Sequence, residues 1–139
     1  MLALLGTAAV SAQDMNVNDV PSDLRTSFER AYPNAKDVEW EMEGENYKVE
    51  FEIEREDHEI WYSSEGNTAK MEKEISDSDL PQPIQSAITS SYDGYTIDEI
   101  DMIEENGGAT YEVELEKSGD DDKKVIFDAD GKVLNEMND

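Results

Sequence analysis

The side chains with the greatest capacity for chemistry in this sequence are its carboxylates. The 139 residues include 36 Asp and Glu against 11 Lys and Arg, which gives a formal net charge of −25. Between positions 38 and 54, glutamates alternate almost without a break with apolar residues. Carboxylates at this density could act as an acid–base pair, hold a cation or attract a basic protein. Because almost any two of them could be named as a pair, their abundance alone indicates no catalytic site.

The other common catalytic residue types are scarce. The only histidine, His58, lies between Asp57 and Glu59 near the start of an expected strand, where we expect it to be solvated. No serine lies in a Gly-x-Ser-x-Gly elbow, and the absence of cysteine removes thiolate nucleophiles, disulfides and thiolate metal sites. The sequence therefore predicts a protein that is not an enzyme.

Two aspartate-rich segments contain the hard oxygen ligands that calcium prefers. The candidate ligands are Asp120, Asp121, Asp122, Asp128 and Asp130. The segment that starts at Asp128 is similar to the beginning of an EF-hand loop, but its twelfth position is Asp139 instead of glutamate. Asp130 and Gly131 also match a hairpin turn, which is the interpretation we favour. We therefore predict no required cofactor, with weak calcium binding as the alternative.

The charge balance argues against two classes of partner. A protein that binds nucleic acid needs Lys and Arg to displace counterions from the phosphates, and a protein that docks on anionic lipid needs them for a similar attraction. A formal charge of −25 instead fits a basic protein partner, a cation-rich medium or a need for solubility.

Residues 1–12 differ in kind from the rest of the chain. They begin with the uncharged apolar run MLALLGTAAV, and Val10 and Ala12 occupy the −3 and −1 positions of a small-residue cleavage site. The run is shorter than the roughly 20 residues that span a bilayer. We interpret residues 1–12 as a signal peptide that lacks a basic n-region and residues 13–19 as a linker, with a buried N-terminal helix as the alternative. The expected mature protein is periplasmic or secreted, with no membrane insertion after signal cleavage.

The rest of the chain reads as two copies of one unit, residues 20–77 and 78–139. The dipeptides Val20-Pro21 and Leu80-Pro81 open the two copies sixty residues apart. Further along, the pattern YKVEF at 47–51 recurs as YEVEL at 111–115. An ordered series of matches at a nearly fixed offset indicates an internal repeat.

Each copy is predicted to form one helix followed by four strands. The first helix begins at Pro21 or Ser22, with Ser22 as its N-cap, and ends before Pro33, whereas the second begins at Pro81 and ends at Gly94. Alternation of apolar and charged residues predicts strands with one dry and one wet face. The expected strands cover residues 38–43, 47–54, 58–63, 69–74, 96–104, 110–117, 123–128 and 132–136. The predicted fold class is α+β, with two tandem helix-plus-four-stranded antiparallel sheet units and the helices packed on one sheet face.

The first hairpin can be aligned from its turn at residues 44–46. Its dry face would hold Val38, Trp40, Met42, Tyr47, Val49, Phe51 and Ile53. Placing Met42 opposite Tyr47 brings Glu39 opposite Glu50, a like-charge pair that costs up to about 1 kcal/mol. The glutamates are therefore explained by solubility, by protection against edge pairing or by a cationic partner.

Two large apolar residues are predicted on the wet face. If Ile60 and Tyr62 face the core, Trp61 must face outwards, and Ile126 occupies the matching position in the second copy. Apolar anchors surrounded by charge are common in binding surfaces. The predicted partner-binding residues are Trp61, Ile126, Glu50 and Glu52. The alternative is that the two copies, or a loop, cover these faces.

This plan resembles the PepSY-like, β-lactamase-inhibitor-like family of exported bacterial proteins. The residues that carry the resemblance are Val20-Pro21, Tyr32-Pro33, Val38-x-Trp40, Tyr47-x-Val49-x-Phe51, Tyr62 and Gly66, with Leu80-Pro81, Tyr92, Tyr111-x-Val113-x-Leu115 and Phe127-Asp128-x-x-Gly131 in the second copy. The resemblance implies a periplasmic or secreted binding module of the kind that inhibits a peptidase or β-lactamase, and it supplies no catalytic residues to carry over. An acidic cation-binding or salt-adapted envelope protein is the alternative function.

Overall fold

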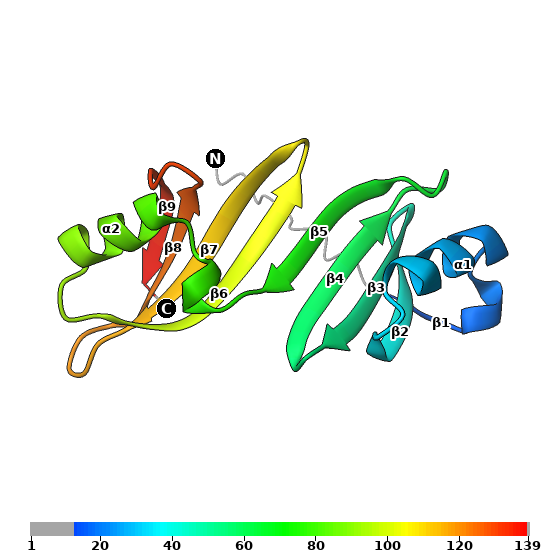
Figure 1. Ribbon diagram of the computed structural model, residues 1–139, viewed down its shortest axis with the longest axis horizontal. Coiled ribbons are helices and arrows are strands. Elements are labelled where there is room, and N and C mark those ends of the chain that lie inside the picture. Colours follow the sequence, from blue (N-terminus) through cyan, green and yellow to red (C-terminus); the bar gives the residue numbers. More distant parts are fainter. Residues whose placement is uncertain (1–12, 139) are drawn as a thin grey trace, which may run out of the picture.

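The computed structural model describes residues 13–138, which form two α-helices, two short 3-10 helices and nine strands (Figure 1). In chain order the elements are β1 (Gln13–Met15), η1 (Val17–Asp19), α1 (Ser22–Ala31), β2 (Lys36–Glu43), β3 (Asn46–Ile53), β4 (Glu56–Tyr62), β5 (Thr68–Glu74), η2 (Asp77–Asp79), α2 (Gln82–Ser91), β6 (Thr96–Glu105), β7 (Gly108–Glu116), β8 (Lys123–Asp128) and β9 (Val133–Asn138). The order of one helix and four strands therefore occurs twice. The predicted signal peptide, residues 1–12, lies outside the described residues.

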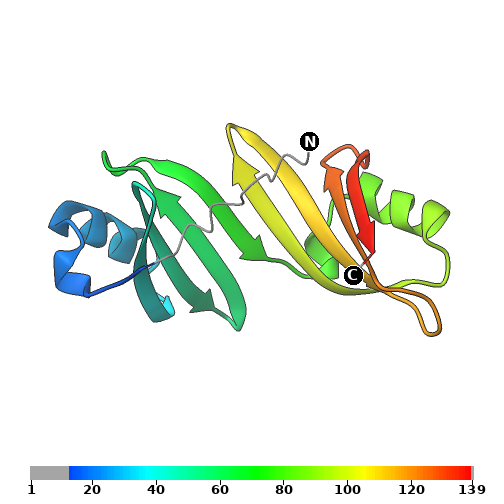
Figure 2. The same ribbon diagram turned by 180° about the vertical axis from the view of Figure 1, so that it is seen from behind.

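All nine strands belong to one antiparallel sheet and follow one another in sequence order (Figure 2). The α+β class and the antiparallel pairing are confirmed, but the strands form one nine-stranded sheet instead of the two tandem four-stranded sheet units that were expected. The two halves join because β5 pairs with β6 from Lys70 opposite Glu105 to Glu74 opposite Asp101. β1, in the segment expected as a linker, adds a further strand beside β2.

Both helices pack on the same face of this sheet. Residues that lie opposite each other on neighbouring strands share a face, and Ile60, Met71, Glu104 form one such cross-strand series through β4, β5 and β6. Ile60 belongs to the core under α1, and Ile100, four residues before Glu104, belongs to the core under α2. The view in Figure 1 agrees, with the helices over opposite ends of the sheet.

Two apolar cores hold the helices to the sheet. Under α1, Leu24 and Phe28 pack against strand residues such as Val49, and under α2 the corresponding residues are Ile84 and Ile88. Ile84 is fully buried, and burial of such a side chain contributes roughly 1.5–3 kcal/mol. The helical spacing of these residues therefore positions each helix on its own half of the sheet.

The helix starts differ from expectation in one detail. Ser22 was predicted as the N-cap of α1, but it is the first helical residue, and Pro21 takes the cap position without a side-chain hydrogen bond. Pro81 has the same place before α2. A proline before the first turn costs little because the first helical N–H groups have no partner within the helix.

The predicted register of the first hairpin is confirmed, with Met42 opposite Tyr47 and Glu39 opposite Glu50. Val38, expected on the dry face, is 40% exposed. The register shifts between Lys36 and Glu39, because a bulge interrupts the alternation there. In the part of the chain that the structure describes, neither helix is long and apolar enough to span a membrane.

Candidate functional site on the outer sheet face

The sheet face opposite the helices, here called the outer face, carries most of the strand carboxylates. Cross-strand pairing arranges them in two rows, which we call the carboxylate rows. The first row is Glu39, Glu50, Glu59 and Glu72 on β2, β3, β4 and β5. The second row is Glu74, Asp101 and Glu112 on β5, β6 and β7. Like charges opposite one another oppose strand pairing, so the rows are a local cost to stability.

Two residues of the carboxylate rows, Glu59 and Asp101, have strongly raised pKa values. Burial, together with the charges of Glu50 and Glu72, raises the pKa of Glu59 to about 7 against the opposing effect of Lys48. Burial and four neighbouring carboxylates, led by Glu99, raise the pKa of Asp101 to about 6. Both carboxyls therefore hold a proton more tightly than a solvated carboxyl does.

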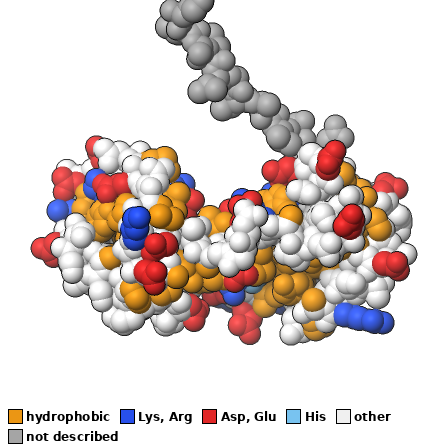
Figure 3. Space-filling model, turned by 90° about the horizontal axis from the view of Figure 1, so that it is seen from above, with side chains coloured by type: hydrophobic (Ala, Val, Ile, Leu, Met, Phe, Trp, Pro, Cys, Tyr) orange, Lys and Arg blue, Asp and Glu red, His pale blue; other side chains and the backbone are white. Residues whose placement is uncertain are grey.

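A shallow hollow lies between the two carboxylate rows. It has a volume of about 190 Å³, and its lining residues are Asp57, Glu59, Glu72, Lys73, Glu74, Glu99 and Asp101. The lining is almost entirely acidic, so the hollow favours a cationic group over an anionic or apolar one. Seen from above, the molecule has two lobes joined by a narrower waist, with acidic side chains on both lobes (Figure 3).

Lysines neutralise only part of the outer face. Lys48 Nζ lies 2.7 Å from Glu50 Oε1 and 3.6 Å from Glu59 Oε2. Lys70 Nζ lies 3.4 Å from Glu72 Oε1. On the other half of the sheet, Lys124 Nζ lies 3.1 Å from Glu112 Oε1 and 3.5 Å from Glu114 Oε1. In the first row Glu50, Glu59 and Glu72 each thus lie within 4 Å of a lysine, and in the second row Glu112 does.

Trp61 lies on the outer face, as predicted, but it is not an open apolar anchor. Its side chain is only 8% exposed, because Lys48 and Lys70 cover the ring with their Nζ atoms 5.2 Å and 4.6 Å from its centroid. Its Nε1 donates a hydrogen bond to Glu43 Oε2 at 2.8 Å. A partner would reach the indole only after displacing the lysines. The predicted binding role of Trp61 therefore stays a prediction, but exposure does not support it.

The other predicted binding residues are spread over the sheet. Ile126 is half-buried on β8, opposite Glu112 and Asn135. Three strands separate it from Trp61 on β4, a distance of about 19 Å at the usual strand spacing. Glu50 lies in the first carboxylate row, and Glu52 lies opposite Asp57 at the margin of the face. The structure therefore brings Glu50 close to Trp61 through Lys48, but does not bring Trp61 and Ile126 together.

The residues that sequence reasoning missed are Glu59, Glu72 and Asp101. Alternation along β4, β5 and β6 could have placed them on the wet face. Their meeting in one hollow depends on the β5–β6 pairing, which joins the two halves of the chain.

The predicted metal residues serve other contacts in the structure. Asp128 Oδ1 accepts hydrogen bonds from the backbone N–H groups of Asp130 and Lys132, both at 2.9 Å, and so holds the β8–β9 turn. Asp120 Oδ2 lies 3.3 Å from Lys117 Nζ, and Asp121 and Asp122 are exposed. Among the side chains that the structure describes, no three His, Asp or Glu converge closely enough to hold a metal ion.

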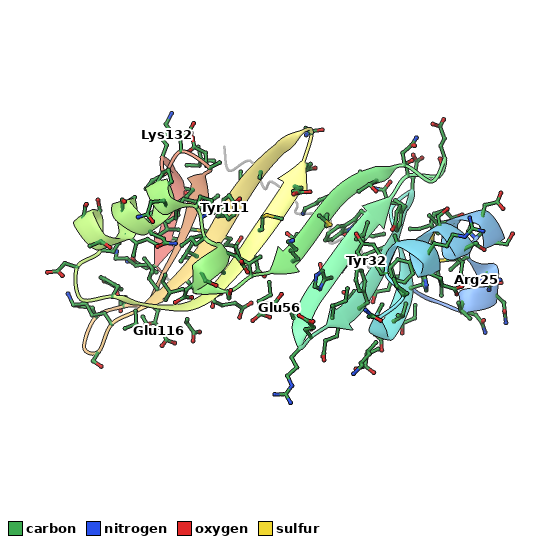
Figure 4. The ribbon with its side chains drawn as sticks, in the orientation of Figure 1. Arg25, Tyr32, Glu56, Tyr111, Glu116 and Lys132 are labelled. Atoms are coloured by element: carbon green, nitrogen blue, oxygen red, sulfur yellow. The ribbon has the colours of Figure 1, made fainter. Side chains whose placement is uncertain are left out.

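His58 lies on the helix side of the sheet. Its ring stacks on Phe51 with a centroid distance of 5.1 Å, and its Nδ1 lies 2.9 Å from the Glu56 carbonyl oxygen. Nearby on this face, Tyr32 at the end of α1 reaches over the sheet, and its hydroxyl lies 3.9 Å from Met71 Sδ (Figure 4). The histidine, expected to be solvated, is thus half-buried against Phe51, which belongs to the core under α1.

The fold and the outer face define a class of small α+β proteins in which helices cover one side of an open antiparallel sheet and leave the other side exposed. The model of the family described as "Putative beta-lactamase-inhibitor-like, PepSY-like" matches residues 9–67 and 53–135. The chain belongs to this PepSY-like family. A comparison with curated proteins finds no match.

Solved structures with the same fold come from Bacteroides species. A DUF2874 family protein from Bacteroides uniformis has a TM-score of 0.69 and 16% identity, over 85% of this chain and 88% of its own. A "putative periplasmic" protein from Bacteroides eggerthii has a TM-score of 0.70 and 16% identity, over 85% and 88%. A BLIP-like protein from Bacteroides fragilis has a TM-score of 0.65 and 24% identity, over 85% and 86%. At these identities the likeness is one of fold.

Proposed function

We propose that this protein is an exported, non-enzymatic binding module that holds a cationic protein partner against its outer face. The observation that carries the proposal is the acidic hollow between the carboxylate rows, where Glu59 and Asp101 have raised pKa values. Carboxylates that oppose one another gain most from an incoming cation. A partner that presents Lys or Arg there would relieve repulsion that the free protein bears.

The family supports the general class of this function. Its description is inhibitor-like and names no reaction, and one structural neighbour carries the name BLIP-like. We therefore infer that the partner is a protein, of which an enzyme such as a peptidase or β-lactamase is one form. Export to the periplasm or beyond is inferred from the apolar residues 1–12 and from the family, and one structural neighbour is described as periplasmic.

Capture of partners from a periplasmic extract tests this function. The test variant combines Glu59→Gln, Glu72→Gln and Asp101→Asn, which removes three charges from the hollow and keeps side-chain size. We expect wild-type protein to retain a basic protein, identified by mass spectrometry, and the variant to lose it because the cationic groups of the partner no longer find paired carboxylates.

The matched control removes three charges elsewhere. Glu29→Gln, Glu45→Gln and Glu65→Gln lie on exposed positions of α1 and of two hairpin turns, so the control has the same formal net charge as the test variant. It should capture the partner as the wild type does. Equal losses in both variants would show that net charge alone attracts the protein, and equal capture by all three would place the binding site away from the hollow.

A further inference from the structure

The last strand of the sheet has an open edge. β9 pairs with β8 from Lys123 opposite Asn138 to Phe127 opposite Val133, and within residues 13–138 no other strand lies beside it. All six of its residues are exposed. The free edge of such a strand presents backbone N–H and C=O groups that can pair with another strand.

Exposed apolar residues are concentrated on β9. The described part of the chain exposes five large hydrophobic residues, and three of them are Val133 at 41%, Leu134 at 50% and Met137 at 43%. The other two, Val17 and Val38, lie at the opposite end of the sheet, on η1 and β2. An apolar group on an unpaired strand edge favours association, because pairing removes it from water.

The one carboxylate of β9 is paired with other side chains of the same chain. This carboxylate, Glu136, accepts hydrogen bonds from the Tyr92 hydroxyl at 2.6 Å and from Lys123 Nζ at 3.0 Å. The whole chain, by contrast, has a formal net charge of −25. The β9 strand itself therefore adds little to the repulsion that a second, equally acidic molecule meets as it approaches.

We propose that β9 is a dimer edge, at which a second copy of this chain adds its own β9 antiparallel and continues the sheet. An antiparallel pair of identical strands is self-complementary about a twofold axis, so one edge serves both molecules. A register centred on Asn135 keeps the two Glu136 carboxylates from lying opposite each other. The surface is separate from the outer-face hollow and does not depend on the proposed partner.

The proposed dimer edge is tested by substitutions that add charges to β9. Val133→Glu with Leu134→Glu adds two carboxylates to each edge. In a register centred on Asn135, residue 134 lies opposite Glu136 of the second copy, so the repulsion between like charges opposes pairing. The control, Val17→Glu with Val38→Glu, makes the same change at the two exposed valines far from β9. Weight-average mass is measured by sedimentation over a wide range of protein concentration at low and high sodium chloride.

We expect wild type and control to approach twice the chain mass at high concentration, and the edge variant to stay monomeric. High salt should strengthen the dimer, because it screens repulsion between two acidic molecules. A wild type that is monomeric at every concentration and salt overturns the proposal and leaves the edge for a strand of another protein. A dimer that survives the edge substitutions, or that salt dissociates, overturns it as well.

A second measurement does not depend on the folding of the edge variant. The chain has no cysteine, so Asn135→Cys introduces a single thiol on β9 and Ser64→Cys introduces one on the exposed β4–β5 turn. With a short bismaleimide linker, Asn135→Cys should give a covalent dimer in high yield and Ser64→Cys should not. Equal yields for both would contradict pairing at β9.

Discussion

At the scale of single residues, the carboxyl of Glu59 shows how the outer face stores unfavourable energy. It lies between Glu50 and Glu72 on neighbouring strands, and burial raises its pKa to about 7. The folded protein is therefore more stable when the Glu59 carboxyl is protonated than when it is ionised. Residues kept in this state are common where a ligand or partner is bound, although structural clusters have the same effect.

Glu59→Gln should stabilise the protein near neutral pH and flatten its pH dependence. Because the pKa of Glu59 in the folded chain lies above its ordinary value of 4.5, the folded chain binds more protons than the unfolded chain between those pH values. Stability from this group is full below pH 4.5 and is lost as the pH rises through about 7. Thermal melts of wild type at pH 5.5 and 8 should show the higher Tm at the lower pH, by an amount that shrinks in Glu59→Gln.

The control for this measurement is Glu45→Gln, which changes an exposed turn residue. It should keep the pH dependence of the wild type. A Glu59→Gln protein with an unchanged pH dependence would show that Glu59 titrates as a solvated carboxyl.

Trp61 shows why exposure could not be deduced from alternation. Period-two alternation places its indole on the outer face, and the structure agrees. The cation–π contacts with Lys48 and Lys70 come from the neighbouring strands β3 and β5. Whether a side chain on the wet face meets water thus depends on the residues beside it in the sheet.

At the scale of elements, the β8–β9 turn packs closely against the start of α2. Gly131 has φ +87°, and a Cβ atom there would lie 2.6 Å from the Pro83 carbonyl oxygen. Gly66, at the matching place in the β4–β5 turn, has φ +85° with no atom within 4 Å of its Cβ position. The two turns share a backbone conformation that favours glycine, but only one also requires the absence of a side chain.

Gly131→Ala should destabilise the protein more than Gly66→Ala. Both substitutions place alanine in the left-handed region, which costs about 1–2 kcal/mol. Gly131→Ala adds a clash with backbone that cannot turn aside, and overpacking of this kind costs about 1–3 kcal/mol more. Urea unfolding of the two variants gives the difference directly. Equal losses would mean that the turn moves away from α2 freely.

At the scale of the whole molecule, a charge of −25 acts on a single elongated sheet. The elements are stabilised locally by two cores, whereas the carboxylates repel one another across the outer face. Screening by salt reduces this repulsion over distances of about 10 Å at 0.1 M. The stability of the whole protein is therefore expected to depend on ionic strength.

Sodium chloride should raise the Tm, and calcium chloride at matched ionic strength should raise it by the same amount. The expected equality follows from the described carboxylates, no three of which converge as a metal site. Differential scanning calorimetry of the same sample in the two salts measures it. A larger rise in calcium would favour the alternative function, a cation-binding envelope protein, and Asp128→Asn with Asp130→Asn would then test the candidate turn.

The local sequence pattern predicted much of the fold. The helices follow from apolar residues at helical spacing after a proline, and the β8 bounds, 123–128, agree with those expected from the sequence. The register of the first hairpin also followed from its turn, since a short connection leaves few ways to pair two alternating strands. Val38 departs from the pattern because a bulge, which alternation does not reveal, shifts the strand beside Trp40.

The sequence by itself therefore determined the two α-helices, the strands β2 to β9 and the face on which most of their side chains lie, because these depend on periodicity along the chain. Only the tertiary structure decided that β5 pairs with β6, that β1 joins the sheet and that β9 remains at its edge. These pairings connect segments separated by a helix, so their register depends on packing between distant parts of the chain. The meeting of Glu59, Glu72 and Asp101 in one hollow follows from the β5–β6 pairing. The covering of Trp61 by lysines follows from the register of β4 with its neighbours β3 and β5.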